Sequence, residues 1–359
     1  MLATVALLAA CDQGKQHDQQ TVGPPVHIVH ANVGPDTALP ADGSIQFALD
    51  RLLLPETATR QSFILADANN NALEPIVTYD PVKMLVTLSN PDGTNGQWLT
   101  PGQPYKVIAP VPFVQNGASF GLKAIDGAGL ESQQTIGFLV TSPLGAGGAL
   151  KESFCADVLP IFQSRCGTGA CHGAPGNVTP SERFPDGHST PAAGLVLDNS
   201  TGVAQTAIGR VAQGSNTGAR AGYPGSYGDK FGIDMPIIDA NNNPDKPLGS
   251  PGNSWLMYKL LLATPLTSET TPLSATDCKG GTVPFTKEPL PAVETTAPGD
   301  DERARLSDYV LGNQMPYPPN PGTDNTQSNL TVDELERVQT WIAQGAVVDD
   351  CSVCIPPTK

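Results

Sequence analysis

Residues 158–173, which read VLPIFQSRCGTGACHG, decide the fold of the second half of the chain. In this stretch Cys166 and Cys171 are separated by four small residues, and His172 directly follows the second cysteine. Three kinds of region carry such a cluster: a covalent cofactor-attachment site, one half of a zinc site, or a disulfide region beside a histidine. Which of the three is present decides whether this half of the chain folds around a cofactor, a metal ion or neither.

Covalent haem attachment is the use that employs all three side chains. Two cysteines form thioethers with the vinyl groups of the porphyrin, and a histidine directly after the second coordinates the iron on the same face. Two residues usually separate the cysteines, whereas four do so here. Because Gly167 and Gly169 allow an outward bulge at little steric cost, both sulfurs can still reach the ring.

Four segments of this half have the pattern of amphipathic helices. Ser153 can cap a helix whose apolar face leads into Cys166, with Pro160 as a kink. Thr331 and Glu334 form a capping-box pattern ahead of another apolar face. A core so rich in loops needs a staple or a cofactor. The expected helices are 153–166, 253–263, 300–312 and 331–345, separated by Gly- and Pro-rich loops at 174–193, 213–252 and 264–300.

Length and charge narrow the possible functions. The 359 residues are enough for about two domains, and 37 Gly with 35 Pro indicate many loops and short strands. The chain has 35 acidic and 20 basic residues, a net charge of -15. This charge disfavours nucleic acid and anionic lipid surfaces, so we expect no nucleic-acid partner and favour a basic protein partner.

The first residues read MLATVALLAAC, a short apolar run that ends in LAAC at 8–11. This segment resembles a bacterial lipoprotein signal with its lipobox, although no Lys or Arg precedes the run. In that family the signal is cut before the cysteine. The resemblance implies a signal at residues 1–11, lipid on Cys11 and a polar tether at 12–23. We therefore expect an exported protein, periplasmic or at the cell surface, anchored by lipid to the inner or outer membrane.

Residues 24–142 alternate apolar and polar residues over short segments. Ile45, Phe47 and Leu49 alternate in SIQFALD, and Asp-Gly pairs at 42–43, 92–93 and 126–127 supply turns. About seven such strands predict an all-β sandwich. The successive segments PDTALPADGSIQFALDRLL, FILAD, YDPVKMLVTL and LTPGQPYKVIA also resemble bacterial Ig-like domains. Domains of that kind usually serve as spacers or adhesion modules.

Residues 143–150, within SPLGAGGAL, are a flexible linker by composition. Beyond it, residues 151–355 resemble a class I c-type cytochrome domain of planctomycete-type lipoproteins. The resemblance implies a mainly α domain with long loops, and one covalent haem c held by Cys166 and Cys171. It also implies His172 as the proximal iron ligand and Met315 as the distal one. The carrying blocks are VLPIFQSRCGTGACHG, GLVLDNSTGVAQTAIG from 194, PGNSWLMYKLL from 251, MPYPP from 315 and LTVDELERVQTWIAQGA from 330.

The residues themselves also favour Met315, because QMPYPP places a thioether in a Pro-bounded loop just after a helix end. A thioether opposite an imidazole favours reduced iron and suits electron transfer. A lone Met can equally fill a core. Met235, which also precedes a proline, and Met257 are the lesser candidates.

Four further cysteines would need partners in an oxidising compartment. In the cytochrome fold the first and last helices cross near their ends, so the resemblance implies a bridge from Cys155 to Cys351 or Cys354. Cys278 would take the other one. The sequence alone allows three connectivities.

Two other interpretations compete with the haem hypothesis. One is a zinc site made of Cys166, Cys171, Cys351 and Cys354, which leaves His172 unexplained. The other is a disulfide-stapled structural or adhesive surface lipoprotein without haem. The sequence favours a multidomain, extracytoplasmic monohaem cytochrome that transfers electrons to or from a basic redox partner. No catalytic acid, base or nucleophile stands out, so an electron carrier is favoured over an enzyme.

Overall fold

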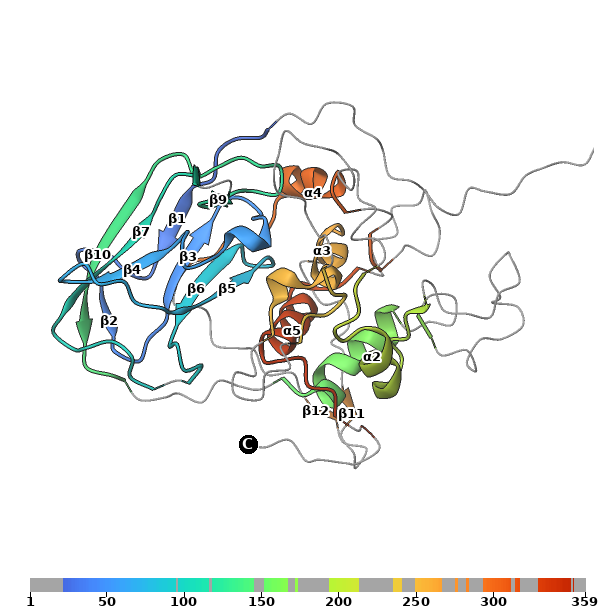
Figure 1. Cartoon of the computed structure of the whole chain (residues 1–359). Helices are drawn as coiled ribbons and strands as arrows, with labels where there is room; N and C mark the ends of the chain where they lie inside the picture. Colours follow the sequence, from blue (N-terminus) through green and yellow to red (C-terminus); the bar gives the residue numbers. More distant parts are fainter. Residues whose placement is uncertain are drawn as a thin grey trace, which may run out of the picture.

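The computed structural model describes residues 22–94, 96–115, 118–144, 152–166, 172–173, 194–212, 235–240, 249–266, 275–276, 282–283, 293–310, 314–316, 329–349 and 351. They form a β-rich N-terminal region with a region of short helices beside it (Figure 1). The expected signal, most of the tether and residues 145–150 of the linker lie outside the described residues. The chain has the all-β beginning of a multidomain protein.

Two four-stranded sheets make up the N-terminal region (Figure 1). The first is fully antiparallel, in the order β1 (Ile28–Ala31), β3 (Ile45–Leu49), β6 (Leu85–Ser89), β5 (Ile76–Asp80). The second has the order β2 (Ala38–Pro40), β10 (Gln134–Thr141), β7 (Pro104–Ala109), β4 (Ile64–Asp67). In it, β2 runs parallel to β10 and the other pairs are antiparallel. A 3-10 turn at Pro55–Thr57 and a hairpin of β8 (Phe113–Gln115) and β9 (Ala118–Phe120) complete the region.

Both sheets contribute to one apolar core, as the alternation of the sequence predicts. Ile45, Phe47 and Leu49 of β3 are fully buried, and the ring of Phe47 stacks on that of Phe63, just before β4, with centroids 5.0 Å apart. Because β3 and β4 belong to different sheets, this contact joins the two layers. The N-terminal region is therefore a two-layer β-sandwich.

The second region consists of short elements rather than long helices. The segment 153–166 is α1 (Leu159–Ile161) flanked by π-helical turns at Phe154–Val158 and Phe162–Cys166. Pro160 lies in α1 between these two turns, and because it has no N–H it cannot donate a hydrogen bond to the turn that precedes it. The other elements are α2 (Ser200–Thr206), a 3-10 turn at Pro251–Asn253, α3 (Trp255–Leu261), β11 (Ala275–Thr276), β12 (Thr282–Val283), α4 (Asp300–Ser307) and α5 (Val332–Ala343).

The predicted helix starts are confirmed where the capping chemistry is strong. The Ser153 hydroxyl accepts a hydrogen bond from the Ala156 amide. Thr331 and Glu334 form both bonds of the capping box at the start of α5. The sequence did not predict α2 as a helix, although Asn199 caps it by accepting from the Gly202 amide at 2.7 Å. Strong local capping therefore marks the ends of helices that are otherwise short.

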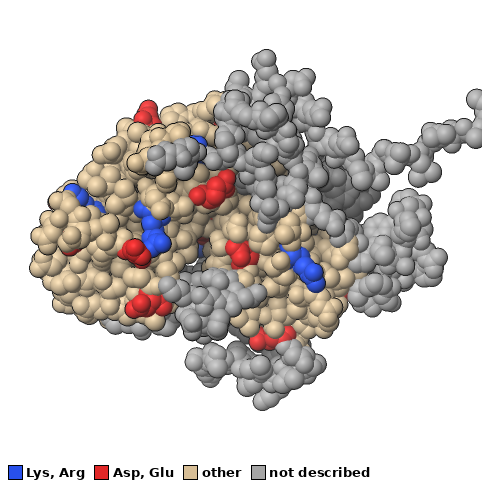
Figure 2. Space-filling view, in the orientation of Figure 1, with Lys and Arg blue, Asp and Glu red and all other residues tan. Residues whose placement is uncertain are grey.

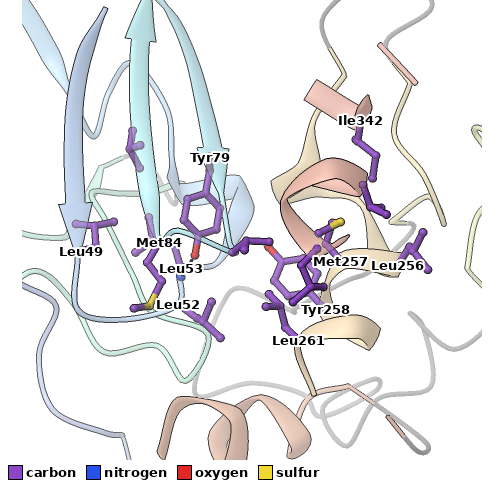
Figure 3. Close-up of a cluster of buried hydrophobic side chains, with 14 of the residues drawn as sticks. Leu49, Leu52, Leu53, Tyr79, Met84, Leu256, Met257, Tyr258, Leu261 and Ile342 are labelled. Carbon is purple, nitrogen blue, oxygen red and sulfur yellow. Dashed lines mark hydrogen bonds between the residues drawn. The ribbon is translucent and has the colours of Figure 1, made fainter. Parts of the chain in front are cut away.

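One continuous hydrophobic cluster joins the sandwich to the helical region. Figure 3 shows Leu52 and Tyr79 of the sandwich facing Tyr258 and Leu261 of α3. Gly252 lies so close to Tyr79 that a Cβ atom there would meet the tyrosine ring at 2.8 Å. The close approach of the 3-10 turn to β5 thus needs a glycine. The two regions pack as neighbours and not as separate bodies joined only by a linker.

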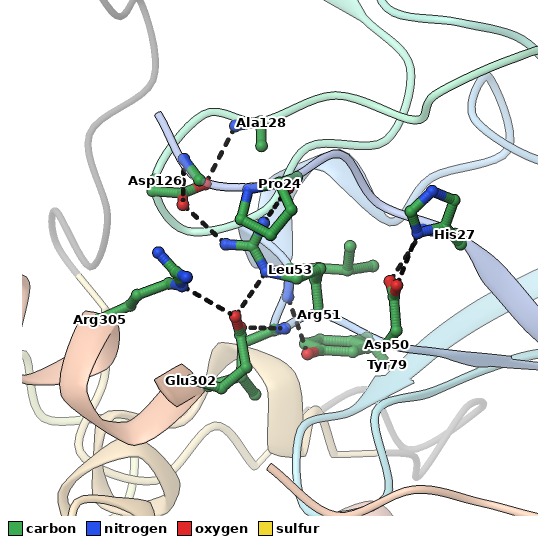
Figure 4. A network of polar contacts seen from close by, with 12 residues as sticks. Pro24, His27, Asp50, Arg51, Leu53, Tyr79, Asp126, Ala128, Glu302 and Arg305 are labelled. Atoms are coloured by element: carbon green, nitrogen blue, oxygen red, sulfur yellow. Dashed lines mark hydrogen bonds and ion pairs between the residues drawn. The ribbon is translucent and has the colours of Figure 1, made fainter. Parts of the chain in front are cut away.

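A buried ion network crosses the same boundary (Figure 4). The Arg51 guanidinium donates to Glu302 of α4 and, at 2.6 Å, to Asp126 of the sandwich. The second oxygen of Glu302 accepts from the Leu52 amide at 2.9 Å. Burial acts to lower the pKa of Arg51, but the carboxylates of Glu302 and Asp126 outweigh it and raise that pKa. Glu302 therefore provides a buried polar contact between the helical region and the sandwich, beside the apolar one.

One face of the molecule carries dispersed charge. On the face drawn in Figure 2, basic and acidic side chains of the described residues are scattered among uncharged ones. None of the helices in the described ranges has the length and apolar character to cross a membrane.

Candidate functional site

The structure brings Cys166 and His172 of the motif together. Cys166 ends the first helical segment and is 6 % exposed, and its carbonyl accepts a hydrogen bond from the His172 amide at 3.1 Å. This bond closes the loop of the motif, so the histidine returns to the end of the helix that carries the first cysteine. Cys171 lies outside the described residues.

The imidazole of His172 is buried and oriented. Its Nδ1 lies 3.2 Å from the Leu195 carbonyl oxygen, which can only accept, so Nδ1 carries the proton and donates. In a neutral ring this places the lone pair on Nε2, which is the nitrogen that would ligate a metal. His172 is only 6 % exposed, and its own carbonyl accepts from the Leu197 amide at 2.8 Å. Both main chain and ring are therefore fixed by the segment 195–197.

A second layer of contacts holds that segment in place. The Thr206 hydroxyl of α2 accepts from the Val196 amide at 2.9 Å and donates to the Gly202 carbonyl at 2.7 Å. A Cβ at Gly202 would meet the Val196 side chain at 2.3 Å, so only glycine lets α2 approach this closely. Helix α2 therefore positions residues 195–197, and these residues in turn position His172. Sequence reasoning missed Thr206 and Gly202, and the Asn199 cap was the signal that could have revealed α2.

Aromatic packing and charge hold the first helical segment against α5. The rings of Phe154 and Phe162 lie 5.3 and 6.0 Å from that of Trp341, centroid to centroid. Arg165, next to the first cysteine of the motif, pairs with Glu334 of α5 at 3.0 Å. The capping residue of α5 thus also positions the end of the segment that carries the motif.

A disulfide links the two ends of this region. Cys155 is bonded to Cys351, which lies 196 positions later in the chain, just past the end of α5. The predicted bridge from Cys155 is confirmed, with Cys351 as its partner. Because Cys351 is oxidised, it cannot be a thiolate ligand, so the four-cysteine zinc hypothesis is wrong in that form. Cys278 and Cys354 lie outside the described residues.

Met315 is anchored at a different place from His172. Its amide donates to the Lys259 carbonyl of α3 at 3.1 Å, and its half-buried side chain packs at the edge of the apolar cluster. Burial lowers the pKa of the neighbouring Lys259 ammonium to about 8. The structure therefore places Met315 beside α3, while Cys166 and His172 are joined to each other.

The two lesser methionine candidates are more deeply packed. Met257 is fully buried on α3, among the side chains that contact the sandwich (Figure 3). Met235 is 3 % exposed, and its carbonyl accepts from the Ala212 amide at 2.9 Å. Both fill the core, whereas Met315 lies at its margin.

An open cleft of about 500 Å³ lies between the sandwich and α4, away from the motif. Its walls include Asp50, Asp300 and Asp301 together with the Arg51 and Glu302 pair. The two best-buried charges of this cleft are bonded to each other, so they serve the junction of the two regions. Over the described ranges no three His, Cys, Asp or Glu residues are grouped so that they could hold a metal ion.

No protein-family model matches the chain, and no curated protein matches it either. The N-terminal part of the bacterial S-layer protein SbsC resembles it over 29% of this chain and 22% of that one, with 19% identity and a TM-score of 0.21. The Escherichia coli alpha-2-macroglobulin fragment spanning MG0-NIE-MG1 resembles it over 34% and 33%, with 10% identity and a TM-score of 0.25. The chain thus spans a third or less of these proteins, and similarities this weak identify neither a family nor a function.

Proposed function

We propose that the protein is an exported, lipid-anchored monohaem cytochrome of the c type that transfers electrons. The observation that carries the proposal is His172, a buried histidine directly after the second cysteine of a Cys-Cys-His motif, whose Nδ1 donates to a carbonyl. Structural histidines in cores also donate in this way. The hydrogen bond from the His172 amide to the Cys166 carbonyl brings this histidine back to the first cysteine of the motif, which favours a ligand role.

Of the proposed proximal set, Cys166 and His172 are described, and they fit a covalent haem. Cys166 and Cys171 would form the thioethers, and Nε2 of His172 would face the iron. The hydrogen bond from Nδ1 to the Leu195 carbonyl would fix the orientation of the imidazole and raise its basicity as a ligand. When bound, the group would supply a one-electron redox centre. The apolar residues around Phe162 and Trp341 would exclude water from that side.

Met315 is the proposed distal ligand. Its side chain lies at the margin of the apolar cluster, where it can turn toward a bound group without leaving a cavity in the core. Met235 and Met257 would each have to leave a packed position. In Met315→Ala we expect loss of the absorption band that thioether ligation gives ferric haem, and a lower potential. In Met235→Ala we expect both to persist; the opposite pattern would transfer the assignment to Met235.

The sandwich supports an Ig-like assignment through its strand order. If β1, β3, β5 and β6 are taken as strands A, B, D and E, the first sheet reads A-B-E-D. The second sheet then places β4, β7 and β10 as C, F and G, the division found in Ig constant-type domains. In this proposal the Ig-like sandwich carries the cytochrome domain at the membrane to which Cys11 is anchored.

The proposed redox partner is a basic protein. A net charge of -15 would accelerate encounter with a positively charged surface at low salt. Electron exchange with such a partner should therefore slow as ionic strength rises. An exchange rate that does not depend on salt would contradict this part of the proposal.

The decisive experiment is a pyridine haemochrome spectrum of protein made with a cytochrome c maturation system, after denaturation and acid-acetone extraction. Retained haem with the thioether-type spectrum is expected. The variant Cys166→Ser with Cys171→Ser should lose it, whereas Cys155→Ser with Cys351→Ser should keep it. Loss of haem on extraction of the unsubstituted protein would contradict the proposal.

The second candidate is a disulfide-stapled structural or adhesive lipoprotein without haem. The Cys155–Cys351 bond favours it, because this bond staples the helical region without any cofactor. In that case a nonreducing peptide map would show Cys166 bonded to another cysteine. For the haem protein the same map would show Cys166 and Cys171 in one haem-bearing peptide.

A further inference from the structure

The two outer faces of the sandwich differ. Part of the outer face of the first sheet is covered by the segment that leads into α4, where Val293 is buried against Ala48 of β3 and Leu85 of β6. The second sheet, made of β2, β10, β7 and β4, lies on the side of the sandwich away from the helices (Figure 1). On its outer face Leu139 of β10 is 54 % exposed. One outer face is thus covered from within the chain, while the other presents a leucine to solvent.

The outer face of the second sheet carries almost no charge. Phe138 and Val140 of β10 are buried in the core, so the alternate positions of this strand face outward. The strand pairing extends the outward row to the other three strands. At these outward positions Lys106 is the one charged residue, and the others are Ile, Leu, Ala, Pro, Thr and Gly. The Lys106 ammonium donates to Asn70 at 2.6 Å, in the turn after β4, which directs it toward that edge of the sheet.

Gly137, in the middle of β10, is not required by the packing of the chain itself. Its φ is not positive, and a Cβ added there would meet no atom closer than the Tyr105 carbonyl oxygen, at 3.9 Å. The fold therefore has room for a side chain at a position where glycine costs stability. A glycine inside a strand often marks a place where another backbone or a ligand approaches closely. In the outward row Gly137 lies next to Leu139, so a bare position adjoins a projecting side chain.

We propose that the outer face of the second sheet binds the same face of a second copy of this chain in a two-fold symmetric dimer. Around an axis that passes between Gly137 and Leu139, the leucine of each copy lies over the glycine of the other. Two sheets packed face to face in this way repeat the geometry of the sandwich core. The rest of a chain with net charge -15 repels its copy, whereas this face has no acidic residue to oppose itself. The low charge of the face therefore favours a second copy as its occupant.

The edges and the size of the sheet also fit a face-to-face contact. Ala66 of β4 pairs with Ala72 beyond that edge, and β2, at the other edge, has three residues and ends at Pro40. Neither edge therefore offers a long free strand for pairing between copies. The face extends about 27 Å along β10 and about 19 Å across the four strands, so two copies cover at most about 1,000 Å². That is the lower limit for a specific interface, and we expect a reversible dimer with a micromolar Kd.

Sedimentation equilibrium measures this dimer directly. The chain is made from residue 12 onward, which removes Cys11 and keeps every described residue, and a nonreducing gel checks that no disulfide joins the copies. A monomer–dimer equilibrium in the micromolar range is expected. Leu139→Asp places two carboxylates in the contact and should raise the Kd at least about tenfold. The matched control is Val114→Asp on β8, where the native side chain is 73 % exposed, and it should leave the Kd unchanged.

Gly137→Ala separates association from folding. In dilute solution its urea midpoint should not fall, because the nearest atom to the added Cβ lies 3.9 Å away. The same Cβ meets the partner's Leu139 and should raise the Kd at least about tenfold. A chain that stays monomeric throughout the micromolar range, or a Kd that neither Leu139→Asp nor Gly137→Ala changes, would overturn the inference. A Gly137→Ala midpoint that falls together with the affinity would also overturn it, since the glycine would then serve the fold.

Discussion

The sandwich and the helical region are stabilised in different ways. In the sandwich, β7 pairs with β10 over six residues and with β4 over four. Many equivalent contacts therefore contribute to its stability. The helices are short, from three residues in α1 to twelve in α5. Besides their apolar packing, a few single long-range contacts hold them together, such as the Cys155–Cys351 bond. In the sandwich, a single substitution removes one of many hydrogen-bonded pairs between strands. In the helical region, a single substitution can remove the only long-range contact of its kind among those described.

The junction offers the strongest way to test this comparison. Glu302→Ala leaves Arg51, whose side chain is 4 % exposed, with less compensating charge, and should cost about 3 kcal/mol of unfolding free energy. Denaturant unfolding should then show the helical region melting before the sandwich. Asp300→Ala on the same helix, where the side chain is 90 % exposed, is the matched control and should cost under ~0.5 kcal/mol. Equal effects of the two variants would mean that the junction contributes little.

Removing the disulfide should have the next largest effect. Cys155→Ala with Cys351→Ala opens a loop of 196 residues and should lower the stability of the helical region by about 2–4 kcal/mol. The measurement is thermal unfolding in a chain that also carries Trp98→Phe and Trp255→Phe, so that the near-ultraviolet tryptophan signal reports Trp341 alone. The far-ultraviolet β signal is followed in parallel. If both signals shifted by the same amount, the two regions would form one cooperative unit and not two differently held ones.

A pair of threonines compares a helix cap with a sheet position. Thr331→Ala removes the cap of α5 and should cost about 1 kcal/mol, with Thr331→Ser restoring most of it. In the sandwich, Thr87 of β6 lies opposite Thr78 of β5, and Thr87→Ala should cost about half as much. Unfolding midpoints in urea give both values. A larger loss at Thr87 would reverse the proposed contrast.

The smallest expected effect is a pH dependence at the edge of the sandwich. Burial raises the pKa of Asp80 to about 6, so its ionised form destabilises the native state. This cost is present above pH 6 and is relieved as the pH falls toward the unfolded value of about 4. Raising the pKa by about two corresponds in full to about 3 kcal/mol, but Asp80 is only half-buried and solvent screens part of it. Asp80→Asn should therefore gain about 1 kcal/mol at pH 7.5 and nothing at pH 4. The same gain at both pH values would exclude ionisation as the cause.

Local patterns in the sequence predicted much of this structure. The alternation of Ile45, Phe47 and Leu49 predicts a strand, and β3 spans those residues. The Thr331 and Glu334 pair predicts the start of α5. Both depend only on residues a few positions apart, where backbone geometry fixes which side chains meet.

Contacts between distant residues could not be predicted in the same way. The Arg51 and Glu302 pair has no local signature, because any exposed-looking Arg and Glu could form it. The carbonyl that holds His172 belongs to Leu195, and every residue type has a carbonyl. For Cys155 the cytochrome resemblance left Cys351 and Cys354 as equal partners, and only the folded path of the chain distinguishes them. The motif gives the chemistry of the candidate site, whereas its supports come from the fold.

The contact of Glu302 with the sandwich also affects the order in which the protein can fold during synthesis. Arg51 leaves the ribosome, and any export channel, 251 residues before Glu302 does. Until then its guanidinium lacks one of its two carboxylate partners, and the Leu52 amide lacks its acceptor. The sandwich is thus completed by α4, an element of the other region that is synthesised after it. The buried ion network of the sandwich can therefore form in full only after α4 has been made.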